Sequence, residues 1–251
     1  MPHFNLALRI AAIAFCGLYF SMAQAEAPSR PFKNFDSAKR VARDAIYLGY
    51  EKTFYCDCDF QLSRTKSGGI IDPDRCRYEP RKNPKRGAQL EWEHVVPASI
   101  FGRSKACWKK GHTKCVKADG TPFKGRACCS KVDKSFREAE ADLHNLTPAV
   151  GELNGDRSDL RYGLVPGEQR EYGRCDFEIG GTPRVAEPRE AIRGDAARIW
   201  FYMADTYGVK LTTAEIKMYK EWSEGDPPNQ RERLRNIRIE AAQGNVNPYV
   251  Q

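Results

Sequence analysis

Eight cysteines that follow a predicted export signal constrain the fold more than any other feature of this chain. The full sequence has nine cysteines, and Cys16 lies within that signal. An even number of cysteines in an exported chain predicts four disulfides formed in an oxidising compartment. Zinc binding is the alternative, but the sequence has no Cys-x-x-Cys pair, the spacing usual at tetrahedral zinc sites. The pairing stays open, although adjacent cysteines should reach different partners. The eight are Cys56, Cys58, Cys76, Cys107, Cys115, Cys128, Cys129 and Cys175.

The first 25 residues have the pattern of a secretion signal. Arg9 precedes an apolar stretch from Ile10 to Met22, and residues 23–25 have the small-x-small form that signal peptidase cleaves. A membrane anchor needs roughly 18 or more consecutive apolar residues, so an uncleaved anchor is the less favoured alternative. We expect the mature protein to begin near Glu26 and to form one domain, residues 26–251, that is periplasmic or secreted.

Positive charge is concentrated in the middle of the chain, whose formal net charge is +8. Eleven Lys and Arg residues lie between Arg103 and Arg137, and only Asp119 and Asp133 oppose them. Clustered positive charge favours a polyanionic partner such as nucleic acid, bound through its phosphates. A basic surface is often merely solvated, so this cluster gains weight only beside other evidence.

The pattern along the chain predicts a mixed α+β domain without repeats or linkers. Helical spacing from Ala38 to Ile46 follows a cap at Asp36 or Ser37, and apolar runs predict strands. We expect further helices in the second half of the chain, three of them at its end. The expected strands are 53–60, 90–96 and 175–179, and the expected helices are 38–46, 135–143, 149–154 (opened by Thr147-Pro148), 188–207, 213–224 and 228–243.

Two segments between these elements are not expected to be core elements. Residues 64–86 are rich in Gly, Pro and charge, which predicts a loop. Residues 102–130 are basic, contain several glycines and hold half of the eight cysteines. We therefore expect this second segment to be an excursion held by disulfides.

Two polar segments carry the chemistry. Residues 91–97 read Glu-Trp-Glu-His-Val-Val-Pro, and residues 142–157 end in Gly-Glu-Leu-Asn-Gly-Asp-Arg. The imidazole of His94 can deprotonate water near pH 7, and a carboxylate with an amide oxygen can hold a hard cation. On a strand, Glu93 and His94 point to opposite faces. That suits in-line phosphodiester hydrolysis, in which metal and attacking water lie on opposite sides of phosphorus.

The segments 90–98 and 140–158 resemble the endonuclease I family of periplasmic and secreted bacterial nucleases. Weaker similarity at 54–58, 172–175 and 244–248 extends the resemblance over nearly the whole mature chain. It implies a disulfide-stabilised α+β domain whose active site is a ββα-metal finger. It also implies cleavage of DNA, and often RNA, with little sequence preference and with one Mg²⁺ or similar cation.

The same resemblance implies the site residues. The general base falls on His94, and the two direct metal ligands fall on Glu93 and Asn154. Asn145 is equally polar, but its place in a turn suits bonds to backbone groups that hold the finger together. His144 is interpreted as structural, and Glu91 as an exposed or structural carboxylate.

Two further site residues follow from the family pattern. Arg126 matches an arginine on the scissile phosphate, and Glu140 matches a glutamate near the leaving group. Residues 112–124 look like an insertion relative to that pattern, with Cys115 pairing to Cys128. Because the insertion directly precedes Arg126, Lys114 is the alternative phosphate-binding cation. Arg157 is expected to brace the finger.

Together these features predict an exported, metal-dependent, sequence-nonspecific endonuclease. Glu93 and Asn154 would hold Mg²⁺, His94 would activate water, and Glu140 would assist protonation of the leaving group, giving 5′-phosphate products. The expected partners are DNA and possibly RNA, contacted through the backbone by a monomer with no membrane association. The alternative is a disulfide-rich exported protein that binds nucleic acid or another polyanion without cutting it.

Overall fold

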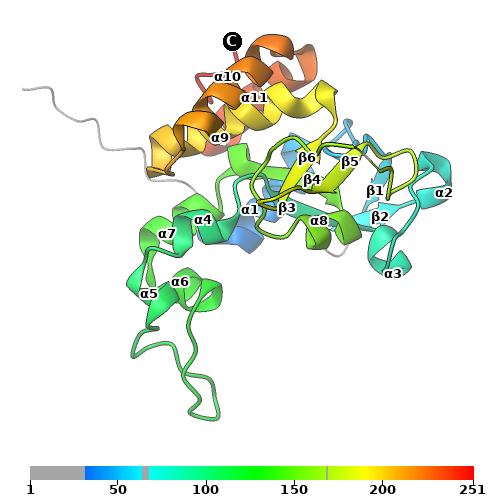
Figure 1. The fold of residues 1–251 in the computed structure, drawn as a ribbon. Coiled ribbons are helices and arrows are strands. Elements are labelled where there is room, and N and C mark those ends of the chain that lie inside the picture. Colours follow the sequence, from blue (N-terminus) through cyan, green and yellow to red (C-terminus); the bar gives the residue numbers. More distant parts are fainter. Residues whose placement is uncertain (1–31, 64–67, 168) are drawn as a thin grey trace, which may run out of the picture.

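A four-stranded antiparallel sheet carries the first polar segment and the start of the second. The computed structural model describes residues 32–63, 68–167 and 169–251, so the expected signal at 1–25 lies outside the described residues. The strands follow one another across the sheet in chain order (Figure 1). They are β1 (Phe60–Leu62), β2 (Gly69–Ile71), β3 (Gln89–His94) and β4 (Leu146–Val150).

The strands β3 and β4 and the helix that follows them form a ββα unit. Pairing runs from Leu90 opposite Val150 to His94 opposite Leu146. Helix α8 (Gly151–Arg157) begins directly after β4 and packs against β3. The two polar segments, about fifty residues apart in sequence, therefore lie side by side in the expected finger topology.

The expected start of this helix at Thr147-Pro148 is wrong. Both residues belong to β4, where they pair with Glu93 and Trp92. Thr147 and Pro148 have the chemistry of a helix start, but pairing with β3 along five positions overrides that local preference. β4 is an edge strand of the sheet, the place where a proline is accommodated.

Three other boundaries differ from expectation. Residues 53–59 form a turn at 54–56 and a single bridge at Asp59 instead of a strand. Cys56 and Cys58 are tied by disulfides to Cys175 and Cys76, and Asp57 adopts a positive φ of 54°. The expected loop 64–86 contains β2 and two short helices, α2 (Pro73–Cys76) and α3 (Pro84–Gly87). Pro188 ends a strand instead of starting a helix.

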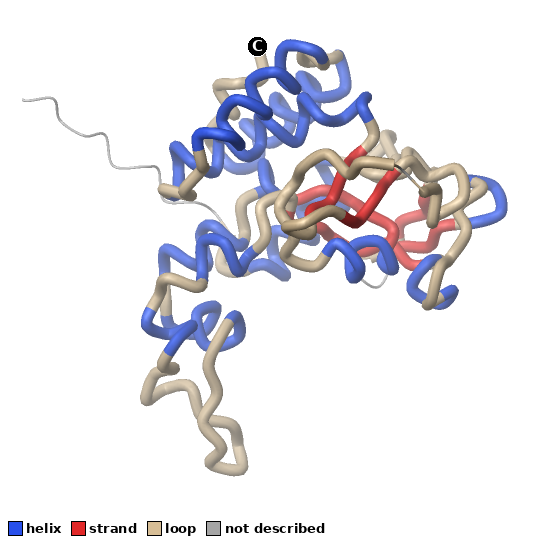
Figure 2. Tube along the Cα trace, viewed as in Figure 1, coloured by secondary structure: helices blue, strands red, loops and turns tan. Residues whose placement is uncertain are grey.

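The remaining elements agree with the expected pattern to within a few residues. The first helix is α1 (Phe35–Val41) continued by a π-helical turn, η1 (Ala42–Ile46), and its cap is Asn34 instead of Asp36 or Ser37. The three closing helices pack together on one side of the strands (Figure 2). The others are α7 (Lys134–Glu140), η2 (Leu143–Asn145), β5 (Phe177–Gly180), β6 (Val185–Pro188), η3 (Glu190–Ile192), α9 (Arg193–Tyr207), α10 (Thr213–Gly225) and α11 (Gln230–Gln243). A mixed α+β domain is confirmed.

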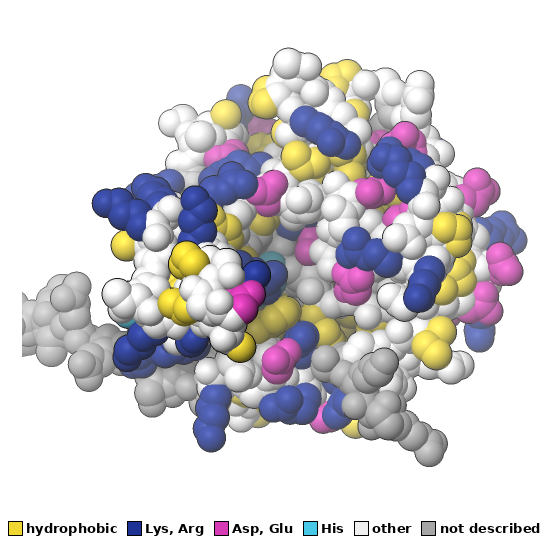
Figure 3. Space-filling view, turned by 90° about the horizontal axis from the view of Figure 1, so that it is seen from below, with side chains coloured by type: hydrophobic (Ala, Val, Ile, Leu, Met, Phe, Trp, Pro, Cys, Tyr) yellow, Lys and Arg dark blue, Asp and Glu magenta, His cyan; other side chains and the backbone are white. Residues whose placement is uncertain are grey.

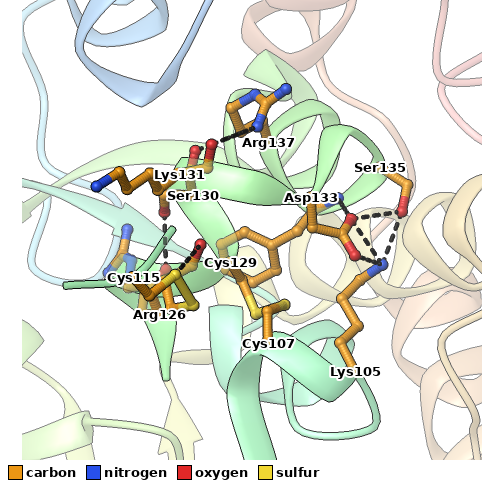
Figure 4. The surroundings of a disulfide bond; sticks show 12 residues. Lys105, Cys107, Cys115, Arg126, Cys129, Ser130, Lys131, Asp133, Ser135 and Arg137 are labelled. Carbon is orange, nitrogen blue, oxygen red and sulfur yellow. Dashed lines mark hydrogen bonds and ion pairs between the residues drawn. A yellow bond between two sulfur atoms is a disulfide. The ribbon is translucent and has the colours of Figure 1, made fainter. Parts of the chain in front are cut away.

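The expected excursion projects from the body of the molecule (Figure 1). It follows α4 (Ala98–Gly102) and is framed by α5 (Ala106–Lys109) and α6 (Arg126–Val132). We call residues 109–125 the basic arm. At its base Lys105 forms an ion pair with Asp133, at 3.0 Å (Figure 4).

All eight cysteines are paired, as expected. The bonds are Cys56–Cys175, Cys58–Cys76, Cys107–Cys129 and Cys115–Cys128. Adjacent Cys128 and Cys129 reach different partners, and the expected pairing of Cys115 with Cys128 is confirmed. Two bonds hold the basic arm, and the other two tie the turn at 53–59 to the rest of the domain.

We predict that the two kinds of disulfide differ in their effect on stability. Replacing Cys56 and Cys175 by serine opens a link across 119 residues and should lower the free energy of unfolding by roughly 4–5 kcal/mol. Replacing Cys115 and Cys128, which are 13 residues apart, should cost no more than about 3 kcal/mol. Urea unfolding measures the first effect, and trypsin cleavage within the arm before global unfolding reports the second. Equal destabilisation by both pairs would contradict this division.

Candidate active site

His94 lies at the end of β3 with its ring buried between aromatic side chains. The ring centroid is 4.8 Å from that of Phe35 and 6.4 Å from that of Phe101. Nε2 lies 2.8 Å from the backbone carbonyl oxygen of Glu140. Because a carbonyl oxygen only accepts, Nε2 carries the ring proton and donates it in this bond. Nδ1 is then the nitrogen that can accept a proton.

The environment of His94 keeps the imidazole neutral. Burial, and after it the positive charge of Arg126, lowers the pKa of His94 from its usual 6.5 to about 3. In the uncharged ring with its Nε2 proton donated to Glu140, Nδ1 is the nitrogen that can accept a proton.

Glu93 is buried beside two donors. Its Oε1 accepts hydrogen bonds from the Tyr55 hydroxyl, at 2.9 Å, and from the Arg157 guanidinium, at 2.8 Å. Burial raises the pKa of Glu93, while the positive charge of Arg157 opposes that rise. Both of these side-chain donors bind Oε1, so Oε2 is the carboxylate oxygen available to another ligand.

Asn154 lies on α8 and offers a second oxygen. Its side-chain Nδ2 donates to Oε2 of Glu91 at 2.9 Å, which leaves Oδ1 as the unused acceptor. Glu93 and Asn154 line the same cleft. A carboxylate oxygen and an amide oxygen are ligands suited to a hard cation that keeps most of its water. The donors available here therefore fit a magnesium-like ion.

The described residues contain no cluster of three His, Cys, Asp or Glu side chains placed to hold a metal. A site made of Glu93 and Asn154 has one such side chain only. It would leave most coordination positions to water and substrate, as Mg²⁺ prefers.

Other polar residues of the second segment have the structural roles expected of them. The side chain of Asn145 is buried and bonds both the N–H and the carbonyl of Val96, at 2.7 and 2.9 Å. Nε2 of the buried His144 lies 3.0 Å from the carbonyl of Asn245. Arg157 bonds Glu93 and the carbonyl of His94, each at 2.8 Å. It thereby joins α8 to β3, and its bracing role is confirmed.

Arg126, the first residue of α6, reaches the cleft. Its Nε donates to the Glu140 carboxylate at 2.6 Å, and its guanidinium lies over the Phe35 ring, 5.1 Å from the centroid. About half of the side chain (45%) is exposed. Lys114, the alternative cation, is exposed on the basic arm and does not line the cleft.

The Glu140 side chain lies behind Arg126 and outside the set of residues that line the cleft. Its two carboxylate oxygens accept from Arg126 Nε and from the Ser130 hydroxyl, the second at 2.7 Å, and only 4% of the side chain is exposed. Its backbone carbonyl binds His94. Glu140 thus contacts both the candidate base and the candidate phosphate-binding group, although the sequence suggested a place near the leaving group.

The candidate base, ligands and phosphate-binding arginine converge on a cleft of about 630 Å³. Figure 3 shows a hollow in this face, with Lys and Arg side chains around it. The cleft is lined by residues from β3, α1, α5, α6 and α8, among them Glu93, His94, Asn154, Arg126, Lys39 and Trp108.

Sequence reasoning missed the contribution of α1. Phe35 packs on the His94 ring. Lys39 and Arg126 both lie over the Phe35 ring, with Lys39 Nζ 4.6 Å from its centroid. Phe35 and Lys39 are four residues apart and so share a helix face. Nothing in the sequence connects that face to a strand fifty residues later.

Known proteins are similar to this chain over most of its length. A family model described as Endonuclease I matches residues 34–251. A periplasmic deoxyribonuclease of Aeromonas hydrophila is 37% identical over 82% of this chain and 81% of its own. An extracellular deoxyribonuclease of the same species is 36% identical over 92% and 93%. An extracellular ribonuclease of Bacillus subtilis (strain 168) is 30% identical over 43% of each chain.

In the described part of the chain no helix is both long and apolar enough to span a membrane. The family match covers most of the chain, and the deoxyribonuclease relatives align along most of their own length. The ββα unit of β3, β4 and α8 holds the two segments on which the resemblance rested. The chain belongs to the endonuclease I family.

Proposed function

We propose that this protein is an exported endonuclease that hydrolyses phosphodiester bonds of DNA, and also of RNA, without sequence preference. The observation that carries the proposal is the meeting, in one cleft, of a neutral histidine, a guanidinium, a carboxylate oxygen and an amide oxygen. The names of the Aeromonas and Bacillus relatives support both substrates. Four disulfides and the periplasmic or extracellular relatives support an oxidising compartment outside the cytoplasm. We propose a monomer.

His94 acts as the general base in this proposal. Its Nε2 proton is held by the Glu140 carbonyl, so Nδ1 can take a proton from a water molecule on the attacking side of the phosphate. Packing against Phe35 fixes the ring plane. A base held in one orientation needs less reorganisation when the proton moves.

Arg126 binds the scissile phosphate. Its Nε is used by Glu140, and the remaining guanidinium N–H groups can donate to phosphate oxygens, whose negative charge grows in the transition state. Glu140 acts here as a positioning residue, because its carboxylate orients Arg126 and its carbonyl orients His94. One residue, Glu140, therefore holds both His94 and Arg126 in position.

Glu93 and Asn154 are the residues that would hold one Mg²⁺ or similar divalent cation. Such an ion supplies Lewis-acid stabilisation of phosphate charge and of the departing 3′ oxygen. The chain's own contribution is to hold the two oxygens in place: Arg157 and Tyr55 fix Glu93, and Glu91 fixes Asn154. Departure of the 3′ oxygen leaves the phosphate on the 5′ end of the product.

The basic arm is proposed to dock the nucleic-acid backbone. It lies between Trp108 and Arg126, both of which line the cleft, so a duplex in the cleft passes beside it. Nearby cations are paired, as in Lys105–Asp133 and Arg126–Glu140, but no described acidic residue pairs with the five lysines of the arm. Phosphate contacts position a nucleic acid without reading its sequence. The lysines are Lys109, Lys110, Lys114, Lys117 and Lys124.

The first test is digestion of supercoiled plasmid by the oxidised protein. With Mg²⁺ we expect nicking and fragmentation, and with EDTA we expect binding without cleavage. His94→Ala should lower the rate by about 10²-fold or more, because general-base assistance contributes that much. Circular dichroism verifies that the variant is folded.

Two results would contradict the proposal. If folded His94→Ala still cleaved the plasmid, His94 would not be the general base. A plasmid that is retarded in the gel but never cut would favour the non-catalytic nucleic-acid binder. That alternative accounts for the basic arm and the disulfides, but it gives no reason for the fixed tautomer of His94 or the free oxygens of Glu93 and Asn154.

Arg126 and Lys114 can be separated by substitution. We expect Arg126→Ala to lower kcat by about 10²–10³-fold, the usual cost of removing a donor to transition-state charge. Lys114→Ala should raise KM slightly and leave kcat near wild type, because its side chain lies outside the cleft. The reverse pattern of kcat values would transfer the phosphate-binding role to Lys114.

The arm can be tested through salt dependence. Replacing Lys110, Lys114 and Lys117 by glutamine should make log Kd for duplex DNA depend less steeply on log salt, by about 0.9 for each phosphate that the variant no longer neutralises. The matched control replaces Lys210, Lys217 and Lys220, which are exposed at or near α10, on the far side of the molecule from the arm (Figure 1). Equal slopes for both triple variants would show that net charge, not the arm, governs binding.

A further inference from the structure

An ion pair between Arg86 and Glu91 lies directly beside Asn154. Arg86, on α3, donates from Nε to Oε1 of Glu91 at 2.9 Å and from its terminal nitrogen to Oε2 at 2.7 Å. Oε2 of Glu91 also accepts from Nδ2 of Asn154 at 2.9 Å. Guanidinium, carboxylate and amide thus form a chain of hydrogen bonds that ends at the cleft.

This series of hydrogen bonds fixes the orientation of the Asn154 amide. An ionised carboxylate can only accept hydrogen bonds, so it binds the NH₂ group of an amide and not its oxygen. The two bonds from Arg86 keep Glu91 in that acceptor role. With Nδ2 turned to Glu91, Oδ1 must lie on the opposite side of the amide. Without Glu91, either atom of Asn154 could face a cation.

The helix itself leaves room for the pair. A methyl group at Gly151 would lie 2.8 Å from Oε1 of Glu91, and one at Gly155 would overlap the Arg86 guanidinium. Gly151 and Gly155 are four residues apart and therefore share one face of α8. The two glycines of the Gly-Glu-Leu-Asn-Gly sequence let Arg86 and Glu91 pack closely against the helix beside Asn154.

The segment that carries Arg86 is also anchored to α8. Glu152 is buried, and its Oε1 accepts from the backbone N–H of Lys82 at 2.6 Å and from that of Asn83. Asn83 in turn caps α3 by accepting from the N–H of Arg86 at 3.1 Å. Arg86 is therefore fixed by the same helix whose asparagine it helps to orient.

We propose that the Arg86–Glu91 pair is a positioning device that presents the Oδ1 atom of Asn154 to the catalytic cation. This inference rests on the proposed function, in which Glu93 and Asn154 hold that cation. Glu91 is a positioning residue and not itself a ligand: it acts through the amide of Asn154. Sequence reasoning treated Glu91 as an exposed or structural carboxylate.

The test is Mn²⁺ affinity without nucleic acid, measured from the EPR signal of the free ion. Glu91→Ala should weaken Mn²⁺ binding by about 10–100-fold, the usual effect of losing a partner that orients a ligand. Glu91→Gln keeps an acceptor oxygen but no charge, and it should bind much more tightly than Glu91→Ala. Adding Asn154→Asp to Glu91→Ala should also restore binding, because two equivalent oxygens need no orienting partner.

The two restoring variants separate positioning from charge. Glu91→Gln is uncharged and Glu91→Ala with Asn154→Asp regains a negative charge, so recovery by both supports positioning. Recovery only where charge is regained would overturn the proposal and make Glu91 an electrostatic contributor or a ligand. Asp159→Ala is the matched control, because this acid of the same cleft contacts Ser99 and Arg103 instead of Asn154. It should bind Mn²⁺ like the parent.

Failure of the proposed function would look different. If the parent protein bound no Mn²⁺ and its plasmid cleavage persisted in EDTA, the metal assignment and the positioning role would both fall. If the parent bound Mn²⁺ and folded Glu91→Ala bound it equally well, only the positioning role would fall. Thermal unfolding followed by circular dichroism shows which variants are folded.

Discussion

Arg157 is a fully buried guanidinium at the last position of α8, and it joins the helix to the strand that carries the candidate base. It bonds the Glu93 carboxylate and the carbonyls of His94 and Val95, and it lies over the Tyr162 ring, 4.8 Å from the centroid. Removing one partner of such a buried pair typically costs about 3–5 kcal/mol, because the other charge is left unpaired. The placement of β3 against α8, and so the cleft between them, depends on this contact.

Burial shifts the pKa values of Glu93 and His94, the two neighbours at the end of β3, in opposite directions. A nearby arginine also acts on each of these pKa values. Removal from water favours the neutral form of each group, so it lowers the pKa of His94 and raises the pKa of Glu93. At His94 the charge of Arg126 acts in the same direction as burial. At Glu93 the charge of Arg157 acts against burial. Two arginines on different helices thus have opposite relations to burial at two adjacent residues of one cleft.

Local pattern predicted the parts of the site that are continuous in sequence. His94 with Glu93, the polar segment around Asn154, and the structural roles of Asn145 and Arg157 all followed from short motifs and the resemblance they carry. Thr147-Pro148 was misread because a helix-start pattern competes with strand pairing that only the folded β3 supplies. Phe35, Lys39 and the Arg86–Glu91 pair could not be found, because their roles come from contacts between segments with no shared periodicity.

The sequence from Gly151 to Arg157 is informative because nearly every position contacts a different part of the molecule. Asn154 faces the cleft, and Glu152 holds the segment before α3. Asp156 receives hydrogen bonds from Tyr172 and Arg81, at 2.8 and 3.2 Å. Gly151 and Gly155 admit the Arg86–Glu91 pair, and Arg157 grips β3. Successive side chains of a helix of two turns point to different sides of its axis. The side chains of α8 therefore contact several segments at once, and this joins those segments around the cleft.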